Sequence, residues 1–320
     1  MRIVLLVGLM LLALVLDAGA CEATHVAVVS QDGNSLAVID TCADKVISTI
    51  AVDHGPANVS ASPDGKLAFV SYPDSGAIGV VDVVHGGPPG KIAFQGEPFG
   101  IAAEEGVIYA SDWSVSRIKR FDVRTAAMTG TAPAGKSSAG IVLDRRTHRL
   151  YVANRDSNDV TVIDSVSMHV IATVPTGKAP FALALAPAGD RLYVGNVHSS
   201  DLTVIDTANI STLATIPVCA MPYGVAVTPD GATVLVTCQH SNELAIIDAR
   251  TRIVLGRVQV GRYPEGVFAG TTGKAYVANW FSGDVSVIEL AGRRELTRIK
   301  VGDGPRYFSA VSSRTDAVRP

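Results

Sequence analysis

Short runs in which apolar residues alternate with small polar residues recur from about residue 25 to the end of the chain. The clearest run closes on an acidic residue, as in residues 160–164 (VTVID) and 202–206 (LTVID). Alternation with a period of two predicts β-strands, because successive side chains of a strand point to opposite faces. No segment carries an apolar period of 3.6 residues over a helical length. The pattern predicts an all-β protein.

This run is repeated seven times at nearly constant spacing. The closing acidic residues are Asp40, Asp82, Asp122, Asp164, Asp206, Asp248 and Glu289, which lie 42, 40, 42, 42, 42 and 41 residues apart. Each repeat holds four short β signals, for example residues 181–186, 191–196, 202–206 and 212–217. Four strands per repeat of this length are typical of a propeller blade. We therefore predict a seven-bladed β-propeller of four-stranded blades, in which the acidic residues organise turns.

The two ends of the repeat array complement each other. The first repeat begins at His25 with its second strand and has no first strand. Beyond the last complete repeat, residues 306–311 (RYFSAV) resemble first strands such as residues 222–227 (PYGVAV). An open ring would expose two unpaired sheet edges, which natural proteins avoid. We expect the C-terminal strand to complete blade one and to close the ring.

The segment before the repeats is typical of a signal peptide. Arg2 precedes an apolar run over residues 3–16, and residues 18–20 (AGA) supply a small-residue cleavage site. A retained membrane anchor and a lipoprotein acylated at Cys21 are the alternatives, but Asp17 and Ala18 stand where a lipobox has apolar residues. We expect a signal peptide over 1–20, the propeller over 21–312 and a tail over 313–320. The mature chain is then periplasmic or secreted, without a transmembrane span.

Four cysteines fit an oxidising compartment. Cys21 and Cys42 flank the first hairpin and are expected to lie opposite each other. Cys219 takes a position that holds Gly in other blades, and Cys238 takes a position that holds Asn. Because both exceptions fall in one blade, we predict two disulfides, Cys21–Cys42 and Cys219–Cys238.

The second strands carry a family resemblance. Residues 150–154 (LYVAN), 192–196 (LYVGN) and 275–279 (AYVAN) resemble the YVTN repeat of exported bacterial (YncE-like) and archaeal surface-layer propellers. The resemblance implies an extracytoplasmic location and a binding or scaffolding role. It extends more distantly to the propeller subunits of bacterial amine dehydrogenases, which implies an alternative role as a subunit or accessory protein of a periplasmic oxidoreductase.

Composition and motifs argue against several function classes. The net charge of −3 and the pI near 6.2 do not favour nucleic-acid binding. No Gly-x-Ser-x-Gly, His-Glu-x-x-His or paired-Cys spacing occurs, so we expect neither an enzyme nor a metal or other cofactor. His198 and His240 share one position on adjacent blades, but without a third ligand they are interpreted as solvated loop residues. A lyase or lactonase with an axial metal, which would need further ligands, is the remaining catalytic alternative.

The loops at one mouth of the ring are the predicted binding face. Aromatic and cationic residues interrupt the repeat there, and such residues are enriched in binding sites. The predicted binding residues are Trp113, Lys136, Arg155, Lys178, His198, His240, Arg262, Trp280 and Arg306. Lys136, Lys178 and Arg262 all follow the Gly position, so we expect an electropositive mouth that favours an anionic small molecule or an acidic protein surface. The protein is expected to be a monomer.

Overall fold

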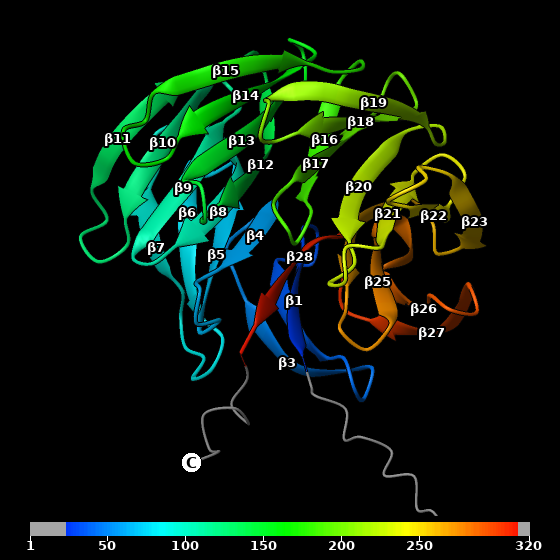
Figure 1. Cartoon of the computed structure of the whole chain (residues 1–320). Coiled ribbons are helices and arrows are strands. Elements are labelled where there is room, and N and C mark those ends of the chain that lie inside the picture. The colour runs from blue at the N-terminus through cyan, green and yellow to red at the C-terminus, as the bar shows by residue number, and fades with distance from the viewer. Residues whose placement is uncertain (1–23, 313–320) are drawn as a thin grey trace, which may run out of the picture.

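The structure is a computed structural model that describes residues 24–312. The expected signal peptide, the tail over 313–320 and Cys21 lie outside the described residues. Residues 24–312 form seven four-stranded antiparallel sheets, arranged around a common axis (Figure 1). The predicted seven-bladed β-propeller is confirmed.

In each blade the first strand lies next to the axis and the fourth lies at the outer edge, except that blade one begins with the C-terminal strand. Blade one contains β28 (Pro305–Val311), β1 (His25–Ser30), β2 (Ser35–Asp40) and β3 (Lys45–Ala51). Blade two contains β4 (Asn58–Ala61), β5 (Leu67–Tyr72), β6 (Ala77–Asp82) and β7 (Gly90–Ala93). Blade three contains β8 (Pro98–Glu104), β9 (Val107–Asp112), β10 (Arg117–Asp122) and β11 (Met128–Pro133). Blade four contains β12 (Ser138–Asp144), β13 (Arg149–Asn154), β14 (Asp159–Asp164) and β15 (Val170–Pro175).

The remaining blades repeat this order. Blade five contains β16 (Pro180–Leu185), β17 (Arg191–Asn196), β18 (Asp201–Asp206) and β19 (Ser211–Pro217). Blade six contains β20 (Pro222–Val227), β21 (Thr233–Cys238), β22 (Glu243–Asp248) and β23 (Val254–Gln259). Blade seven contains β24 (Pro264–Ala269), β25 (Lys274–Asn279), β26 (Asp284–Glu289) and β27 (Arg294–Lys300), with the 3-10 turn η1 (Trp280–Ser282) after β25. Among the described residues no helix is long and apolar enough to cross a membrane.

The C-terminal strand closes the ring as predicted. β28 pairs antiparallel with β1, and Phe308 lies opposite Val28. Figure 1 shows the two strands side by side, the red end of the chain against the blue end. The contact extends into the loop, where the Gln31 amide donates to the Gly304 carbonyl at 2.8 Å. Both ends of the described chain are therefore held in one sheet.

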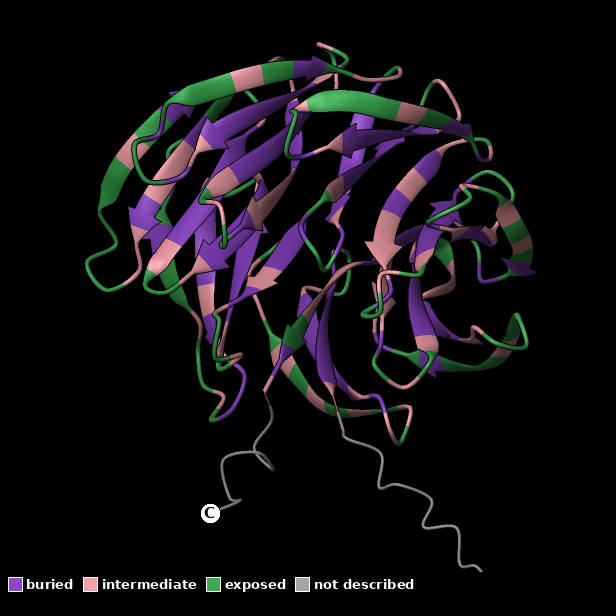
Figure 2. Cartoon of the chain, in the orientation of Figure 1, coloured by how far each residue is buried: buried purple, intermediate pink, exposed green. Residues whose placement is uncertain are grey.

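The burial of the strands explains why the repeat is readable in the sequence. The second and third strands of each blade are packed between neighbouring blades, so β13 and β17 are buried at nearly every residue. The outermost strands face solvent, and β3 alternates exposed and half-buried residues. Figure 2 shows this gradient from buried inner strands to exposed outer strands. Strands covered on both faces are expected to be almost continuously apolar.

The acidic residues that close the third strands organise the next turn, as predicted. The Asp206 carboxylate accepts the backbone N–H groups of Ala208 and Asn209, both at 2.9 Å. Hydrogen bonds from the Asn209 backbone hold the pKa of the Asp206 carboxyl below its ordinary value. The same carboxylate-to-backbone bonds occur at Asp40, Asp82, Asp122, Asp164 and Asp248. Glu289 differs, because it forms an ion pair with Arg294 instead.

Candidate binding site at the mouth of the central channel

Two positions in each blade face the axis at the same end of the ring. We call the second residue of each innermost strand, and its equivalent Ala57 in blade two, the floor position. The floor positions of blades one to seven hold Arg306, Ala57, Phe99, Ala139, Phe181, Tyr223 and Glu265. Glycine often follows the floor position because neighbouring innermost strands approach closely. A Cβ on Gly266 would lie 2.2 Å from the Arg306 carbonyl oxygen.

The second position is the residue directly after each second strand, which we call the rim position. The rim positions of blades one to seven hold Gln31, Pro73, Trp113, Arg155, Val197, Gln239 and Trp280. All floor and rim residues except Ala139, Glu265 and Trp280 line a pocket of about 560 Å³. Its lining is completed by residues of the adjoining loops, namely Asp74, Glu97, His198, Met221 and Tyr263. This volume falls within the roughly 300–1,000 Å³ typical of small-molecule sites.

An aromatic wall runs along one side of the pocket. The rings of Phe99 and Phe181 lie 5.4 Å apart, although they come from blades three and five. They meet because blade four has the small residue Ala139 at the floor position between them. Trp113 packs against Phe99 at 5.4 Å, and Tyr223 packs against Phe181 at 4.4 Å. The wall offers a flat apolar surface to a ligand.

Arg306 occupies the floor of the pocket, and its side chain is only 8% exposed. Its Nε donates to Glu265 Oε2 at 2.6 Å, Nη1 donates to Gln31 Oε1 at 3.1 Å, and Nη2 donates to the Tyr223 hydroxyl at 3.0 Å. The guanidinium also stands 5.3 Å from the ring of Trp280, a cation–π contact. These contacts hold one guanidinium in a fixed orientation at the axis.

Glu265 is the buried counter-ion of Arg306. Its second carboxylate oxygen accepts the Gln239 side-chain amide at 3.4 Å. Burial raises the pKa of the Glu265 carboxyl above its ordinary value, against the opposing influence of Arg306. Burial alone would lower the pKa of Arg306, but the neighbouring Glu265 carboxylate raises it above its usual range. Burial and the ion pair therefore act in opposite directions on the charged form of each side chain.

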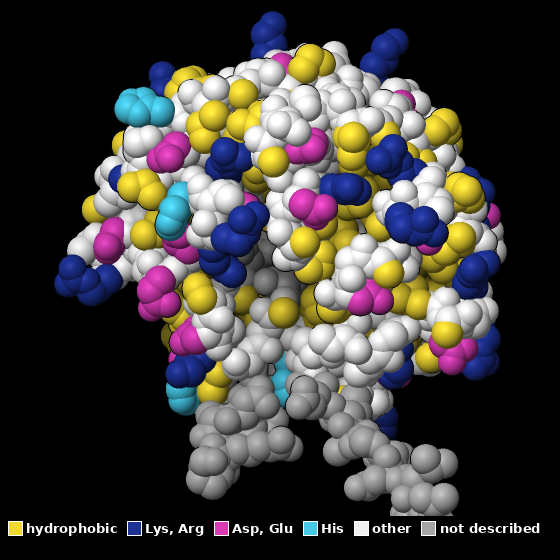
Figure 3. Space-filling model, in the orientation of Figure 1, with side chains coloured by type: hydrophobic (Ala, Val, Ile, Leu, Met, Phe, Trp, Pro, Cys, Tyr) yellow, Lys and Arg dark blue, Asp and Glu magenta, His cyan; other side chains and the backbone are white. Residues whose placement is uncertain are grey.

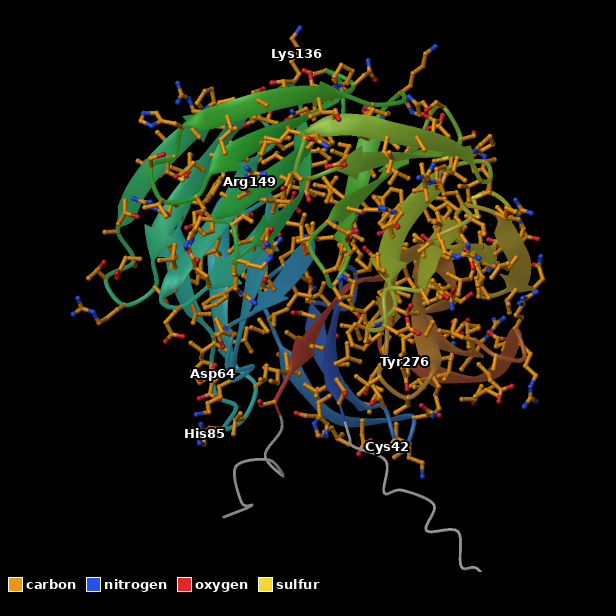
Figure 4. All side chains as sticks on the ribbon, in the orientation of Figure 1. Cys42, Asp64, His85, Lys136, Arg149 and Tyr276 are labelled. Carbon is orange, nitrogen blue, oxygen red and sulfur yellow. A yellow bond between two sulfur atoms is a disulfide. The ribbon has the colours of Figure 1, made fainter. Side chains whose placement is uncertain are left out.

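The structure brings only part of the predicted residue set to the pocket. Trp113, Arg155, His198 and Arg306 line it, and Trp280 packs behind Arg306 with its indole N–H bonded to Asp32 at 3.0 Å. The other predicted residues, Lys136, Lys178, His240 and Arg262, are exposed and lie outside the pocket lining. Figure 4 shows Lys136 extending outward from the body of the protein. Figure 3 shows basic and acidic side chains interspersed over the face turned to the viewer.

Several site residues were not anticipated from the sequence. Gln31, Tyr223, Gln239 and Glu265 all contribute to the pocket or its floor. A signal for Glu265 was present in the sequence, because five other blades place Phe, Tyr or Ala at the floor position and only blade one also places a charged residue there, Arg306. At the rim, the residue directly after the second strand lines the pocket in six blades, and in blades two and five the next residue, Asp74 or His198, lines it as well. In blade six the lining residue is Gln239, which is 1% exposed, rather than the predicted His240.

The repeat also explains the second disulfide. A Cβ on Gly261 would lie 2.5 Å from Asn279 Cγ, so the Gly and Asn positions of a blade contact each other. Blade six places cysteines at both positions, and Cys219 and Cys238 form the predicted disulfide. Among the described residues no cysteine is free. Because Cys21 lies outside the described residues, its pairing with Cys42 stays a prediction.

Blade three has an ion pair where blade four has a hydrogen bond between its second and third strands. In blade four the Asn154 amide donates to the Thr161 hydroxyl at 2.7 Å. The equivalent residues of blade three are Asp112 and Lys119, and they form an ion pair at 2.8 Å with side chains 0% and 12% exposed. Burial would raise the pKa of Asp112, but hydrogen bonds from Lys119, Ser114 and the Glu97 backbone outweigh it and lower the pKa. Asp112, one partner of this ion pair, directly precedes the rim residue Trp113.

The fold and the site together define a class: a seven-bladed β-propeller with an aromatic and charged pocket at one mouth of its channel. Within residues 24–312 no group of three or more His, Cys, Asp or Glu side chains is arranged to hold a metal ion. Residues 106–213 match a family model described as lactonase, 7-bladed beta-propeller. No curated protein matches the chain.

Solved structures share the fold at low sequence identity. A chain of hydrazine synthase from Kuenenia stuttgartiensis is 19% identical with a TM-score of 0.71, over 81% of this chain and 90% of that one. A functionally unknown protein from Desulfotomaculum acetoxidans is 13% identical with a TM-score of 0.78, over 90% and 99%. Apo AztD from Citrobacter koseri is 14% identical with a TM-score of 0.63, over 90% and 98%. These similarities show the propeller fold.

Proposed function

We propose that this protein is an exported propeller that binds a ligand or partner through its mouth pocket without catalysing a reaction on it. The pocket combines an aromatic wall with one oriented guanidinium, which is a recognition arrangement rather than a catalytic one. On the floor, Arg306 and Glu265 are bonded to each other and to neutral side chains. The resemblance to exported YVTN-repeat propellers agrees with this role.

The buried ion pair at the floor is the observation that carries the proposal. Glu265 is 1% exposed and Arg306 is 8% exposed at their side chains, and five other blades fill the same position with neutral residues. A pair of well-packed apolar residues is often at least as stable as a buried ion pair. We attribute the presence of the ion pair at the floor to recognition of a ligand.

Export is the second part of the proposal. The Cys219–Cys238 disulfide supports it, because structural disulfides persist in oxidising compartments. The leader expected over residues 1–20 would direct the chain there.

Site-specific photo-crosslinking in the native periplasm tests the proposed binding face. A photoreactive amino acid replaces His198, which lines the pocket, or His240, which holds the same position one blade further on but lies outside the pocket lining. We expect small-molecule or protein adducts at position 198 and few at position 240. Equal adducts at the two positions would refute the pocket as the functional surface. Adducts with a redox protein would instead support the accessory role in an oxidoreductase system.

A further inference from the structure

The charged side chains around the pocket are separated by sign. Asp74 and Glu97 approach it from blade two and from the loop that enters blade three. Arg155 and His198 approach it from blades four and five, and their side chains are 3.5 Å apart. Within residues 24–312 neither the Asp74 nor the Glu97 carboxylate is hydrogen-bonded to another group. One side of the pocket is therefore acidic, whereas the other carries His198 and the guanidinium of Arg155, which forms an ion pair with Asp156 at 2.8 Å.

The floor adds donors for an oxyanion. Three of the five N–H groups of Arg306 are used by Glu265, Gln31 and Tyr223. One N–H on each terminal nitrogen is left to donate to an oxyanion such as a carboxylate. Because Glu265 already balances the charge of Arg306, a carboxylate bound there brings an uncompensated negative charge. A positive group on the same ligand, placed near Asp74 and Glu97, restores the balance.

The aromatic wall determines the third property of the ligand. Trp113 and Phe99 come from blade three, as Glu97 does, and Phe181 and Tyr223 continue the wall from blades five and six. A flat or apolar group stacked on this wall removes apolar surface from water. Charge at both ends and an apolar group between them describe a zwitterion with a hydrophobic side chain.

From this arrangement, and resting on the proposed binding role, we infer that the mouth pocket takes a small zwitterion: an amino acid or short peptide with an aromatic or large apolar side chain. The ligand carboxylate bonds to Arg306 on the side of Arg155 and His198. Its ammonium group lies toward Asp74 and Glu97. An amino acid and a dipeptide share this chemistry, and the dipeptide holds its two charges further apart, on either side of a peptide group.

Calorimetric titration with four probes that carry the same ring tests the inference. The probes are phenylalanine, the dipeptide Gly-Phe, the anion 3-phenylpropionate and the cation 2-phenylethylamine. We expect at least one zwitterion to bind about tenfold more tightly than either singly charged probe, and the tighter of the two zwitterions reports the length of the ligand. Equal or tighter binding of the anion would overturn the inference, as would no binding of either zwitterion. Adducts at position 198 in the crosslinking experiment would then still support the proposed function.

Two substitutions test separately where the ammonium group and the carboxylate of the ligand bind. Glu97→Gln is expected to weaken the cation and the zwitterion about fivefold and to leave the anion unchanged. Arg155→Gln is expected to weaken the anion and the zwitterion by a similar factor, but not the cation, because the substitution frees the Asp156 carboxylate that Arg155 pairs with. Asp64→Asn and Lys66→Gln are the matched controls, because both side chains are exposed on the β4–β5 turn, outside the pocket lining. Equal losses for all probes in either pocket variant would contradict the assignment of the two sides.

Discussion

The buried ion pair of Asp112 and Lys119 in blade three occupies the same place as the hydrogen-bonded pair of Asn154 and Thr161 in blade four. Substitutions in blade three test whether the neutral pair can replace the ion pair. Asp112→Asn keeps the shape of the side chain and removes its charge. The new amide nitrogen then replaces the oxygen that faces Lys119 Nζ at 2.8 Å, so two donors face each other. The ammonium group of Lys119, whose side chain is 12% exposed, loses its counter-ion.

The loss of stability in Asp112→Asn depends on the contacts that Lys119 keeps. Breaking a buried ion pair on one side costs about 3–5 kcal/mol. Lys119 keeps two backbone acceptors, the carbonyl oxygens of Phe94 at 3.2 Å and Gln95 at 2.8 Å. Its Nζ also stands 4.3 Å from the centre of the Phe94 ring. We therefore expect a loss of about 3 kcal/mol, at the lower end of that range.

The double variant Asp112→Asn with Lys119→Thr rebuilds the neutral pair of blade four. There the Asn154 amide donates to the Thr161 hydroxyl at 2.7 Å, and to Asp159 at 2.6 Å. Blade three has Arg117 at the position of Asp159, so one of these two bonds is not restored. We expect the double variant to recover about 2 kcal/mol of the loss, a coupling within the range observed for residues in contact.

Urea denaturation followed by circular dichroism measures these free energies, and the fluorescence of Trp113, the next residue after Asp112, reports on the same blade. Asp112 has a lowered pKa, so it contributes stability above its ordinary pKa of 3.8 that is lost as the pH falls through the lowered value. In Lys119→Thr the unpaired carboxylate is easier to protonate. The stability gap between wild type and that variant is therefore expected to narrow as the pH falls from 7. A loss below about 0.5 kcal/mol in Asp112→Asn, or no recovery in the double variant, would refute the reasoning.

Three further predictions concern closure, the disulfide and the floor. Deleting residues 306–320 removes most of β28 and is expected to abolish the cooperative thermal transition; a melt within a few degrees of wild type would contradict the closure. Cys219→Gly with Cys238→Asn restores the pair found in other blades, and urea titration should show a folded protein destabilised by about 3 kcal/mol through loss of the crosslink, not an unchanged midpoint. Glu265→Gln with Arg306→Met is expected to be within about 1 kcal/mol of wild type or more stable, yet unable to bind zwitterions. Because the pKa of Glu265 is raised in the folded wild type, the wild type loses stability as the pH rises above 4.5. The stability of the double variant relative to wild type should therefore increase over this pH range, and a decrease would contradict the direction of the pKa shift.

The fold could be predicted because every blade repeats the same strand and turn chemistry. The expected strands of blade five agree with β16, β17, β18 and β19 to within one residue. The disulfide of blade six was predictable for a related reason: two residues that depart from the repeat in one blade occupy positions that touch in the others. Cys219 and Cys238 replace a Gly and an Asn that contact each other in blade seven.

The pocket was only partly predictable because the repeat alone does not reveal which loop residue turns inward. Val197 and Gln239 face the pocket, whereas His240, one residue further along, does not line it. Lys178 and Arg262 follow the Gly position and remain exposed, so their charge does not line the pocket. The partnership of Arg306 with Glu265 joins blades one and seven across 41 residues of sequence, and depends on ring closure.

The central claim, that a ligand binds at the mouth pocket, is tested most directly by fluorine NMR of protein labelled with fluorotryptophan. The chain has two tryptophans, and both report on the mouth: Trp113 lines the pocket and Trp280 packs against Arg306 behind it. Titration with a small-molecule extract of the native periplasm is predicted to shift the Trp113 resonance saturably, with a smaller shift at Trp280. Two unchanged resonances, in a titration where the same extract raises the melting temperature, would show that the ligand binds elsewhere and would contradict the account.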